Sequence, residues 1–127
     1  MDGFAFHPYA YVDNYTDEIS ASEAAFYSQI DFAKQQLDAA MKRDGTSGIT
    51  LWATEFGSIT DDDNKQAAID VRSMVMSRSE PTMRSMSIYN FVSKGTDLTA
   101  GENRCGKVRK KYTAEKPAYV ALSNMNK

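Results

Sequence analysis

Three short stretches rich in apolar and aromatic residues alternate along this chain with segments whose apolar residues recur at helical spacing. This order constrains the fold more than any other feature of the sequence. The stretches 2–9, 49–54 and 83–92 are predicted to be strands, and the first of them ends at Pro8. Because strands that alternate with helices form a parallel sheet with the helices packed on it, the sequence predicts an α/β fold of the order β-α-β-α-β-loop-α.

The first helix is predicted over 21–43. Ser20 and Glu23 have the spacing of a capping box at its start. The apolar residues that recur behind them at helical spacing are Phe26, Ile30, Ala33, Leu37 and Met41. The two glycines of "RDGTSG" end the helix. We therefore expect this helix to pack one apolar face on the sheet.

The second helix is predicted to begin at "TDDDNKQ", whose acidic residues suit the positive end of the helix dipole. Ala68, Val71 and Val75 are expected to form its inner face, and Pro81 ends it. A long loop follows the third strand. A last helix is then predicted to open with Pro117 in its first turn.

The middle strand is apolar or β-branched at every position from 49 to 54, which is typical of a parallel strand covered on both faces. Since side chains alternate along a strand, Leu51, Ala53 and Glu55 are expected to share one face. If the sheet curves into a barrel, that face is the interior and Glu55 points into the mouth. Trp52 would then face the helices.

Right-handed crossovers place the carboxyl ends of all three strands on one rim of the sheet. In parallel α/β proteins this rim carries the functional residues. The residues expected there are His7, Pro8, Tyr9, Glu55, Phe56, Gly57, Tyr89, Asn90 and Phe91. Taken singly, Glu55 also fits a solvated carboxylate at a strand end, His7 a satisfied core histidine, and Tyr9 a rim aromatic.

Composition bounds the class of protein. The 127 residues fit a single domain, 1–127, and can bury a sizeable core. Fifteen basic and seventeen acidic residues nearly cancel, so we expect no nucleic acid and no membrane as partner. The basic residues of 107–111 are expected to lie in a solvated loop.

Cysteine and histidine are too scarce for several kinds of site. The single cysteine, Cys105, cannot form an internal disulfide, and the single histidine cannot form a multi-histidine metal site. We therefore expect no metal and no cofactor. This chain shows no signal peptide pattern, and no stretch approaches the ~20 apolar residues that cross a bilayer.

The segments "DGFAFHPY", "LWATEFG", "IYNF" and "EKPAYVAL", in this order and spacing, resemble the C-terminal part of a retaining glycoside hydrolase of the large (β/α)8-barrel clan. The likeness is to family 39 first and to family 5 next, and it spans nearly the whole chain. It implies the last three βα units, strands 6–8, of a TIM barrel that is incomplete on its own. It also implies a secreted protein whose substrate is a β-linked oligosaccharide or polysaccharide.

The resemblance assigns roles to five residues. In such enzymes the sixth strand often carries His-x-Tyr, which His7 and Tyr9 match, and the seventh carries a Thr-Glu-aromatic-Gly segment, which Glu55 matches. By this resemblance Glu55 would be the catalytic nucleophile that forms a covalent glycosyl-enzyme. His7 and Tyr9 would hold the nucleophile or a sugar hydroxyl. Tyr89 and Asn90 would help to bind the sugar.

The sequence departs from the family pattern in two ways. Retaining enzymes need a second carboxyl group about 5–5.5 Å from the nucleophile to protonate the leaving oxygen. In these barrels it follows an Asn at the end of the fourth strand, and this chain has no Asn-Glu dipeptide. Glu18 and the acidic residues 61–63 are expected in loops on the same rim as Glu55, but no sequence feature identifies any of them as the general acid. In addition, Ile88 stands where the family often has a tryptophan.

Three parallel strands cannot close a barrel, which needs eight. Both edge strands would keep unpaired backbone groups. We therefore expect a missing N-terminal barrel part, or another chain, to complete the sheet, and little or no hydrolase activity from this chain alone. One alternative is a non-catalytic module derived from a barrel, which binds carbohydrate or serves as a structural subunit. Another kind of α/β protein is the remaining alternative.

Overall fold

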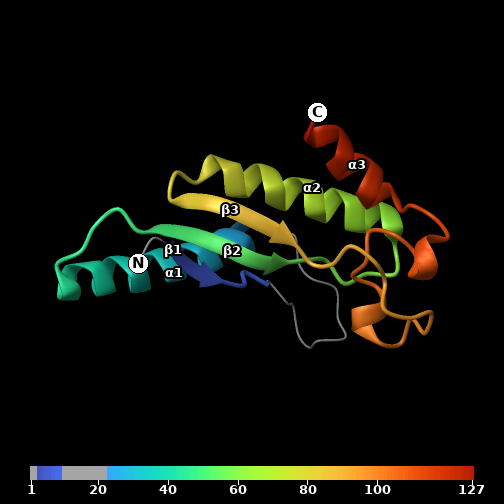
Figure 1. Ribbon diagram of the computed structural model, residues 1–127, viewed down its shortest axis with the longest axis horizontal. Helices are drawn as coiled ribbons and strands as arrows, with labels where there is room; N and C mark the ends of the chain where they lie inside the picture. Colours follow the sequence, from blue (N-terminus) through green and yellow to red (C-terminus); the bar gives the residue numbers. More distant parts are fainter. Residues whose placement is uncertain (1–2, 10–22) are drawn as a thin grey trace.

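Three parallel strands form one sheet in the order β1-β2-β3 in the computed structural model, which describes residues 3–9 and 23–127. The strands are β1 (Gly3–Phe6), β2 (Thr50–Phe56) and β3 (Met83–Ile88). The helices are α1 (Glu23–Asp44), α2 (Asp63–Ser79) and α3 (Pro117–Met125), with 3-10 turns η1 (Gly101–Asn103) and η2 (Lys110–Tyr112) before α3. Figure 1 shows all three strands pointing toward the end of the molecule where these turns lie. The predicted order of elements is confirmed.

The strand ends differ from the prediction. β1 stops at Phe6, two residues before Pro8, and β3 stops at Ile88 instead of continuing to position 92. Pro117 occupies the first turn of α3, as predicted. Ser20, the expected start of a capping box, lies outside the described residues.

One face of the sheet is covered by α1 and α2. In register across the three strands, Phe4 pairs with Leu51 and Leu51 with Met83. Leu51 is fully buried, and this row packs with residues of both helices, including Phe26 of α1 and Ile69 of α2. Because both crossover helices lie on the same face of strands that follow one another in order, the sheet has the geometry of a barrel segment. A doubly wound sheet would carry helices on both faces.

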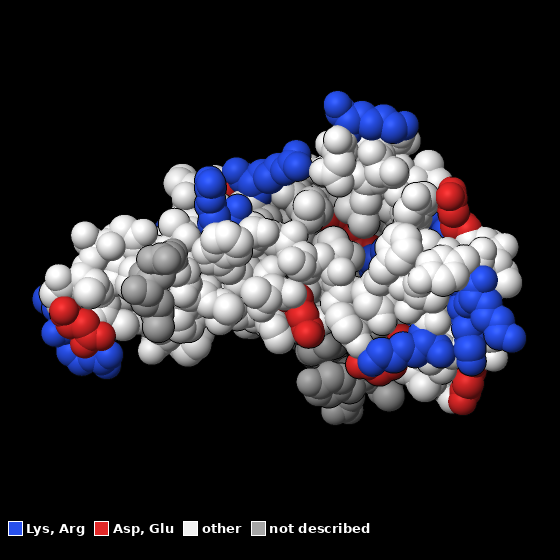
Figure 2. Space-filling model, viewed as in Figure 1, with Lys and Arg blue, Asp and Glu red and all other residues white. Residues whose placement is uncertain are grey.

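The other face of the sheet is open in the described part of the chain. Its central row pairs Ala5 with Trp52 and Trp52 with Ser85. Trp52 is 40% exposed, and its ring lies where a side chain at Gly3 would be. The expectation that Trp52 faces the helices is therefore wrong, because the helices pack on Leu51 and its row. In Figure 2 the surface over the strands carries few charges.

Helix α2 turns a different face inward than predicted. Ala68 and Val75 are exposed, Val71 is half-buried, and the buried set is Gln66, Ile69, Asp70, Ser73, Met76 and Ser77. The prediction failed because four of these six buried residues are polar, and two of them, Gln66 and Asp70, bond to other segments. Asp62 caps the helix start and accepts from the backbone N–H groups of Asn64 and Lys65.

Candidate active site

The carboxyl ends of β1 and β2 bring together three of the side chains that the sequence predicts at the rim. The Tyr9 hydroxyl donates a 3.3 Å hydrogen bond to Oε2 of Glu55. Nδ1 of His7 lies 3.7 Å from the same oxygen, and its Nε2 lies 3.1 Å from the Thr54 hydroxyl. The side chains of Glu55 and His7 are still 42% and 48% exposed. Glu55 is thus positioned by neighbours and remains accessible to a ligand.

A β-bulge aims Glu55 at the open face. Between Ala53 and Phe56, β2 takes three residue steps while β3 takes two. Ala53 and Phe56 are both buried on the covered face. Because side chains alternate, Thr54 after Ala53 and Glu55 before Phe56 both point to the open face. The expectation that Leu51, Ala53 and Glu55 share one face is therefore wrong. Glu55 lies on the open side because of the bulge, and not because it alternates with Leu51 and Ala53.

Gly57 allows the ends of β2 and β3 to approach closely. The Tyr89 N–H donates a 2.6 Å hydrogen bond to the carbonyl of Phe56. A Cβ atom at Gly57 would overlap the carbonyl oxygen of Tyr89, so only glycine fits there. Tyr89 directly follows the end of β3 and packs, partly buried, against the hydrophobic core. The rim consequently runs from His7 through Glu55 to Tyr89.

Two residues that sequence reasoning missed extend this rim. The Tyr89 hydroxyl donates a 2.9 Å hydrogen bond to Oε2 of Glu102, and Nζ of Lys94 lies 2.5 Å from the same oxygen. Nζ of Lys94 also lies 5.4 Å from the centroid of the Tyr89 ring. Lys94 and then Tyr89 hold the pKa of the Glu102 carboxyl below its usual value. The sequence signal that could have indicated Lys94 and Glu102 is their position in the loop that follows the third strand, at the carboxyl end of the sheet.

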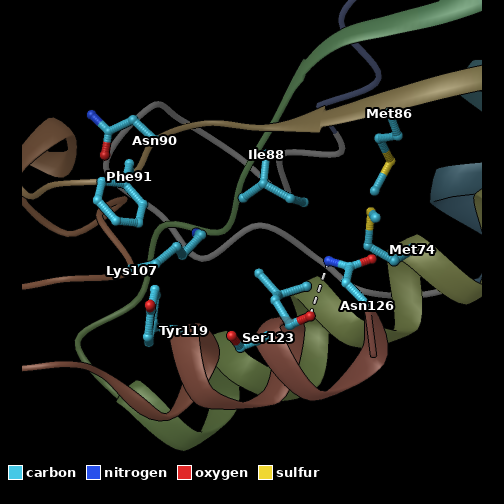
Figure 3. Close-up of a pocket in the computed structure, with 10 residues that line it drawn as sticks. Met74, Met86, Ile88, Asn90, Phe91, Lys107, Tyr119, Ser123 and Asn126 are labelled. Atoms are coloured by element: carbon cyan, nitrogen blue, oxygen red, sulfur yellow. Dashed lines mark hydrogen bonds between the residues drawn. The ribbon is translucent and has the colours of Figure 1, made fainter.

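Asn90, the other residue expected to bind sugar, lines a cavity of about 370 Å³ between β3 and α3. Figure 3 shows Asn90 and Phe91 at one end of this cavity and Met74 and Met86 at the other. Oδ1 of Asn90 is buried and has no hydrogen-bond partner among the described residues. The cavity lies on the covered side of β3, so it is separate from the rim that carries Glu55.

Buried charges hold the loop between β3 and α3 against α2. Nζ of Lys107 lies 2.8 Å from Oδ2 of Asp70, and Lys116 donates to Gln66 at 2.9 Å. Lys107 and Lys116 are 3% and 2% exposed, so the expectation that Lys107 lies in a solvated loop is wrong. Burial raises the pKa of the Asp70 carboxyl, and Lys107 opposes that rise. Burial likewise lowers the pKa of Lys116, and Asp63 opposes that effect.

Two of the three acidic residues at the start of α2 have structural partners. Asp62 caps α2, and Asp63 pairs with Arg109 and Lys116. Glu18 lies outside the described residues. Glu102, held ionised by Lys94, is a poor proton donor. Asp62, Asp63 and Glu102 are therefore engaged with other groups and are poor candidates for the general acid that would serve Glu55.

Within the described residues, no three side chains of the His, Cys, Asp and Glu types gather where a metal ion could bind. No described helix has the length and the apolar character that crossing a membrane requires.

Comparisons with known proteins give matches at the level of structure. No protein-family model and no curated protein sequence matches the chain. It superposes on a family 39 glycoside hydrolase from the gut symbiont Bacteroides cellulosilyticus WH2 with a TM-score of 0.67 and 22% identity, covering 95% of this chain and 26% of that one. It also superposes on Ruminococcus gnavus beta-glucuronidase with a TM-score of 0.60 and 11% identity, covering 98% of this chain and 22% of that one.

These likenesses concern the fold, because both identities are low. The chain spans about a quarter of the length of the two solved structures. The predicted fold, an α/β unit with three parallel strands that matches part of these larger structures and is incomplete as a barrel on its own, is confirmed.

Proposed function

We propose that this chain, as strands 6–8 of a (β/α)8 barrel, supplies the nucleophile part of the active site of a retaining glycoside hydrolase. The substrate would be a β-linked oligosaccharide or polysaccharide outside the cell. One observation carries the proposal: the bulge in β2 places a half-exposed Glu55 on the open face, where the Tyr9 hydroxyl bonds it. The fold shared with two glycoside hydrolases supports it.

In this proposal the Glu55 carboxylate attacks the anomeric carbon while the bond from that carbon to the leaving oxygen breaks. A covalent glycosyl-enzyme forms, and water then releases the sugar with retained configuration. The hydrogen bond from Tyr9 fixes the attacking carboxylate in one orientation, and His7 stands beside the same oxygen. The leaving oxygen takes its proton from an acid that another part of the barrel supplies.

The edge of β3 is where we expect that other part to dock. In the described residues β3 pairs with β2 alone, and the cavity of Figure 3 opens beside it. Met86, Ile88 and Leu122 give this cavity an apolar lining. A strand added parallel to β3 would satisfy its free backbone groups and cover that lining.

The test is the labelling of Glu55 in the complete protein. A 2-deoxy-2-fluoro aryl glycoside traps the glycosyl-enzyme of a retaining enzyme, and mass spectrometry of the digested protein should find the sugar on Glu55. Glu55→Gln should abolish turnover of the aryl glycoside, while Asp44→Asn, which removes an exposed carboxylate at the end of α1, should keep most of it. A Glu55→Gln enzyme with most of its activity would show that the nucleophile is another residue.

A second candidate function is supported by the structural partners of Asp62, Asp63 and Glu102, which make these carboxylates poor general acids. A barrel-derived module with the same rim would bind carbohydrate without cleaving it. In that case the complete protein would retain glycans on an array and would leave aryl glycosides intact. A complete protein that retains no glycan would exclude this function.

A further inference from the structure

A cation, an anion and an aromatic ring form one connected group at the rim, and the proposed chemistry does not use it. Glu102 accepts two hydrogen bonds through the same oxygen, Oε2, from Tyr89 and from Lys94. Lys94 and Glu102 are exposed, at 56% and 57%. Among the described residues Oε1 of Glu102 has no hydrogen-bond partner, so it can accept another donor.

This group is adjacent to the candidate nucleophile. The backbone of Tyr89 contacts Phe56 and Gly57, the two residues that follow Glu55. Tyr89 thus lies beside the strand end that carries Glu55, and its hydroxyl bonds Glu102, which also binds Lys94. A saccharide with one unit at Glu55 would have Lys94 and Glu102 as its next neighbours along the rim.

The loop that carries Lys94 and Glu102 is held in place by hydrogen bonds. Asn103 donates to the carbonyl of Asp97 at 2.7 Å, and Asp97 accepts from the hydroxyl and the backbone N–H of Thr99. Further along the loop, the N–H of Lys107 bonds the carbonyl of Phe91 at 2.9 Å. The two charged groups are thus positioned before a ligand arrives, which lowers the entropic cost of binding.

We infer that Lys94, Glu102 and Tyr89 form a subsite for a neutral sugar unit with adjacent hydroxyl groups. One hydroxyl donates to Oε1 of Glu102, and its neighbour accepts from the Lys94 ammonium, which has three N–H donors. The Tyr89 ring adds apolar contact. Lys94 and Glu102 cancel in charge, and Glu55 adds a carboxylate nearby, so a sugar that bears its own carboxylate is disfavoured. This subsite rests on the proposed function for its role in substrate selection.

The test is calorimetric titration of the complete protein with disaccharides whose sulfur-linked glycosidic bond resists hydrolysis. The probes are thio-analogues of cellobiose, xylobiose, laminaribiose and mannobiose, and a thio-cellobiose with one glucose oxidised to glucuronate. At least one neutral probe should bind, and Glu102→Gln and Lys94→Met should each weaken it about tenfold, as expected for one charge-assisted hydrogen bond. The glucuronate probe should bind more weakly than its neutral parent.

The matched control is Asp44→Asn, which breaks the exposed ion pair with Arg43 at the end of α1 and should leave binding unchanged. Absence of binding by every neutral probe would overturn the inference, as would unchanged affinity in both rim variants or tighter binding of the glucuronate. Because the probes are not hydrolysed, the outcome does not depend on whether Glu55 is the nucleophile. If Glu55 is not labelled but the neutral probes still bind as expected, the proposed function is wrong and the subsite inference stands.

Discussion

The hydroxyl of Tyr9 donates a 3.3 Å hydrogen bond to Oε2 of Glu55, a residue 46 positions later in the chain. The two come from the ends of neighbouring parallel strands, and a bulge in β2 turns Glu55 to the side of the sheet where Tyr9 meets it. Under the proposed function, a carboxylate held in this way would need no rearrangement before it attacks.

Under the proposed function, Tyr9→Phe should lower kcat of the complete protein on an aryl glycoside by about tenfold, because a hydrogen bond to a charged group is worth about 1.5 kcal/mol or more. The loss should fall on kcat more than on KM, since the bond orients the reacting carboxylate. Tyr27→Phe is the matched control, because the Tyr27 hydroxyl bonds Ser79 at 2.8 Å. Equal kcat values for Tyr9→Phe and wild type would show that Tyr9 has no role in positioning Glu55 for the reaction.

Gly57→Ala should destabilise the chain by about 3 kcal/mol, because the added Cβ would overlap the Tyr89 carbonyl and push the strand ends apart. Gly48→Ala provides the comparison. Gly48 has φ +74° with open space around it, so that change should cost only about 1 kcal/mol of backbone strain. Urea unfolding measures both. If the two variants are equally stable, the ends of β2 and β3 are not as close as described.

Much of the fold could be predicted from the sequence because the alternation of strands and helices leaves few arrangements. The location of Glu55 at the rim follows from that order. Its orientation does not, since the bulge between Ala53 and Phe56 has no glycine or proline to announce it. Simple alternation therefore placed Leu51 and Trp52 on the wrong faces.

The rest of the site depends on contacts between distant segments. Lys107 reads as a surface residue within a basic run, and only the folded loop brings it to Asp70. Gln66 and Asp70 give the buried face of α2 a polar pattern that hydrophobic spacing cannot detect. Lys94 and Glu102 are eight residues apart in a loop without regular spacing, and the loop's own hydrogen bonds place them on Tyr89.

Asp70 should give the stability of the chain a distinctive pH dependence. Burial raises the pKa of its carboxyl, although Lys107 and Ser58 oppose this. The native state then holds the proton more tightly than the unfolded chain does. The stabilisation is therefore full at pH values below the pKa of Asp in the unfolded chain, about 3.9. It is lost as pH rises through the higher pKa of Asp70 in the folded chain.

Asp70→Asn removes this titration. The unfolding free energy of wild type minus that of Asp70→Asn should fall as pH rises from about 3.5 toward 7, by no more than about 1.4 kcal/mol per pH unit. Asp97→Asn is the control of opposite sign, because hydrogen bonds from Thr99 lower the pKa of Asp97. The contribution of Asp97 to stability is present at pH values above its pKa in the unfolded chain and is lost as pH falls through its lower pKa in the folded chain. A difference for Asp70 that rises with pH would mean that Lys107 outweighs burial.

Trp52 should report the completion of the sheet. The only tryptophan of the chain lies 40% exposed on the open face, beside Ala5 and over Gly3. If further strands close a barrel, this face becomes a packed interior and the indole loses its water. Fluorescence emission from Trp52 should therefore shift to shorter wavelength when the chain joins the rest of the barrel. The added part must contain no tryptophan, so that Trp52 alone is observed.

The control for this measurement is Phe32→Trp in a Trp52→Phe background. Phe32 is 63% exposed on α1, so a tryptophan there should keep its emission in water when the barrel closes. Native mass spectrometry establishes that assembly has occurred in each sample. An assembled protein in which Trp52 emits as it does in the separate chain would mean that the open face is not the interior of a barrel. The open rim and Glu55 would then face solvent, and the proposed catalytic site would lose its enclosure.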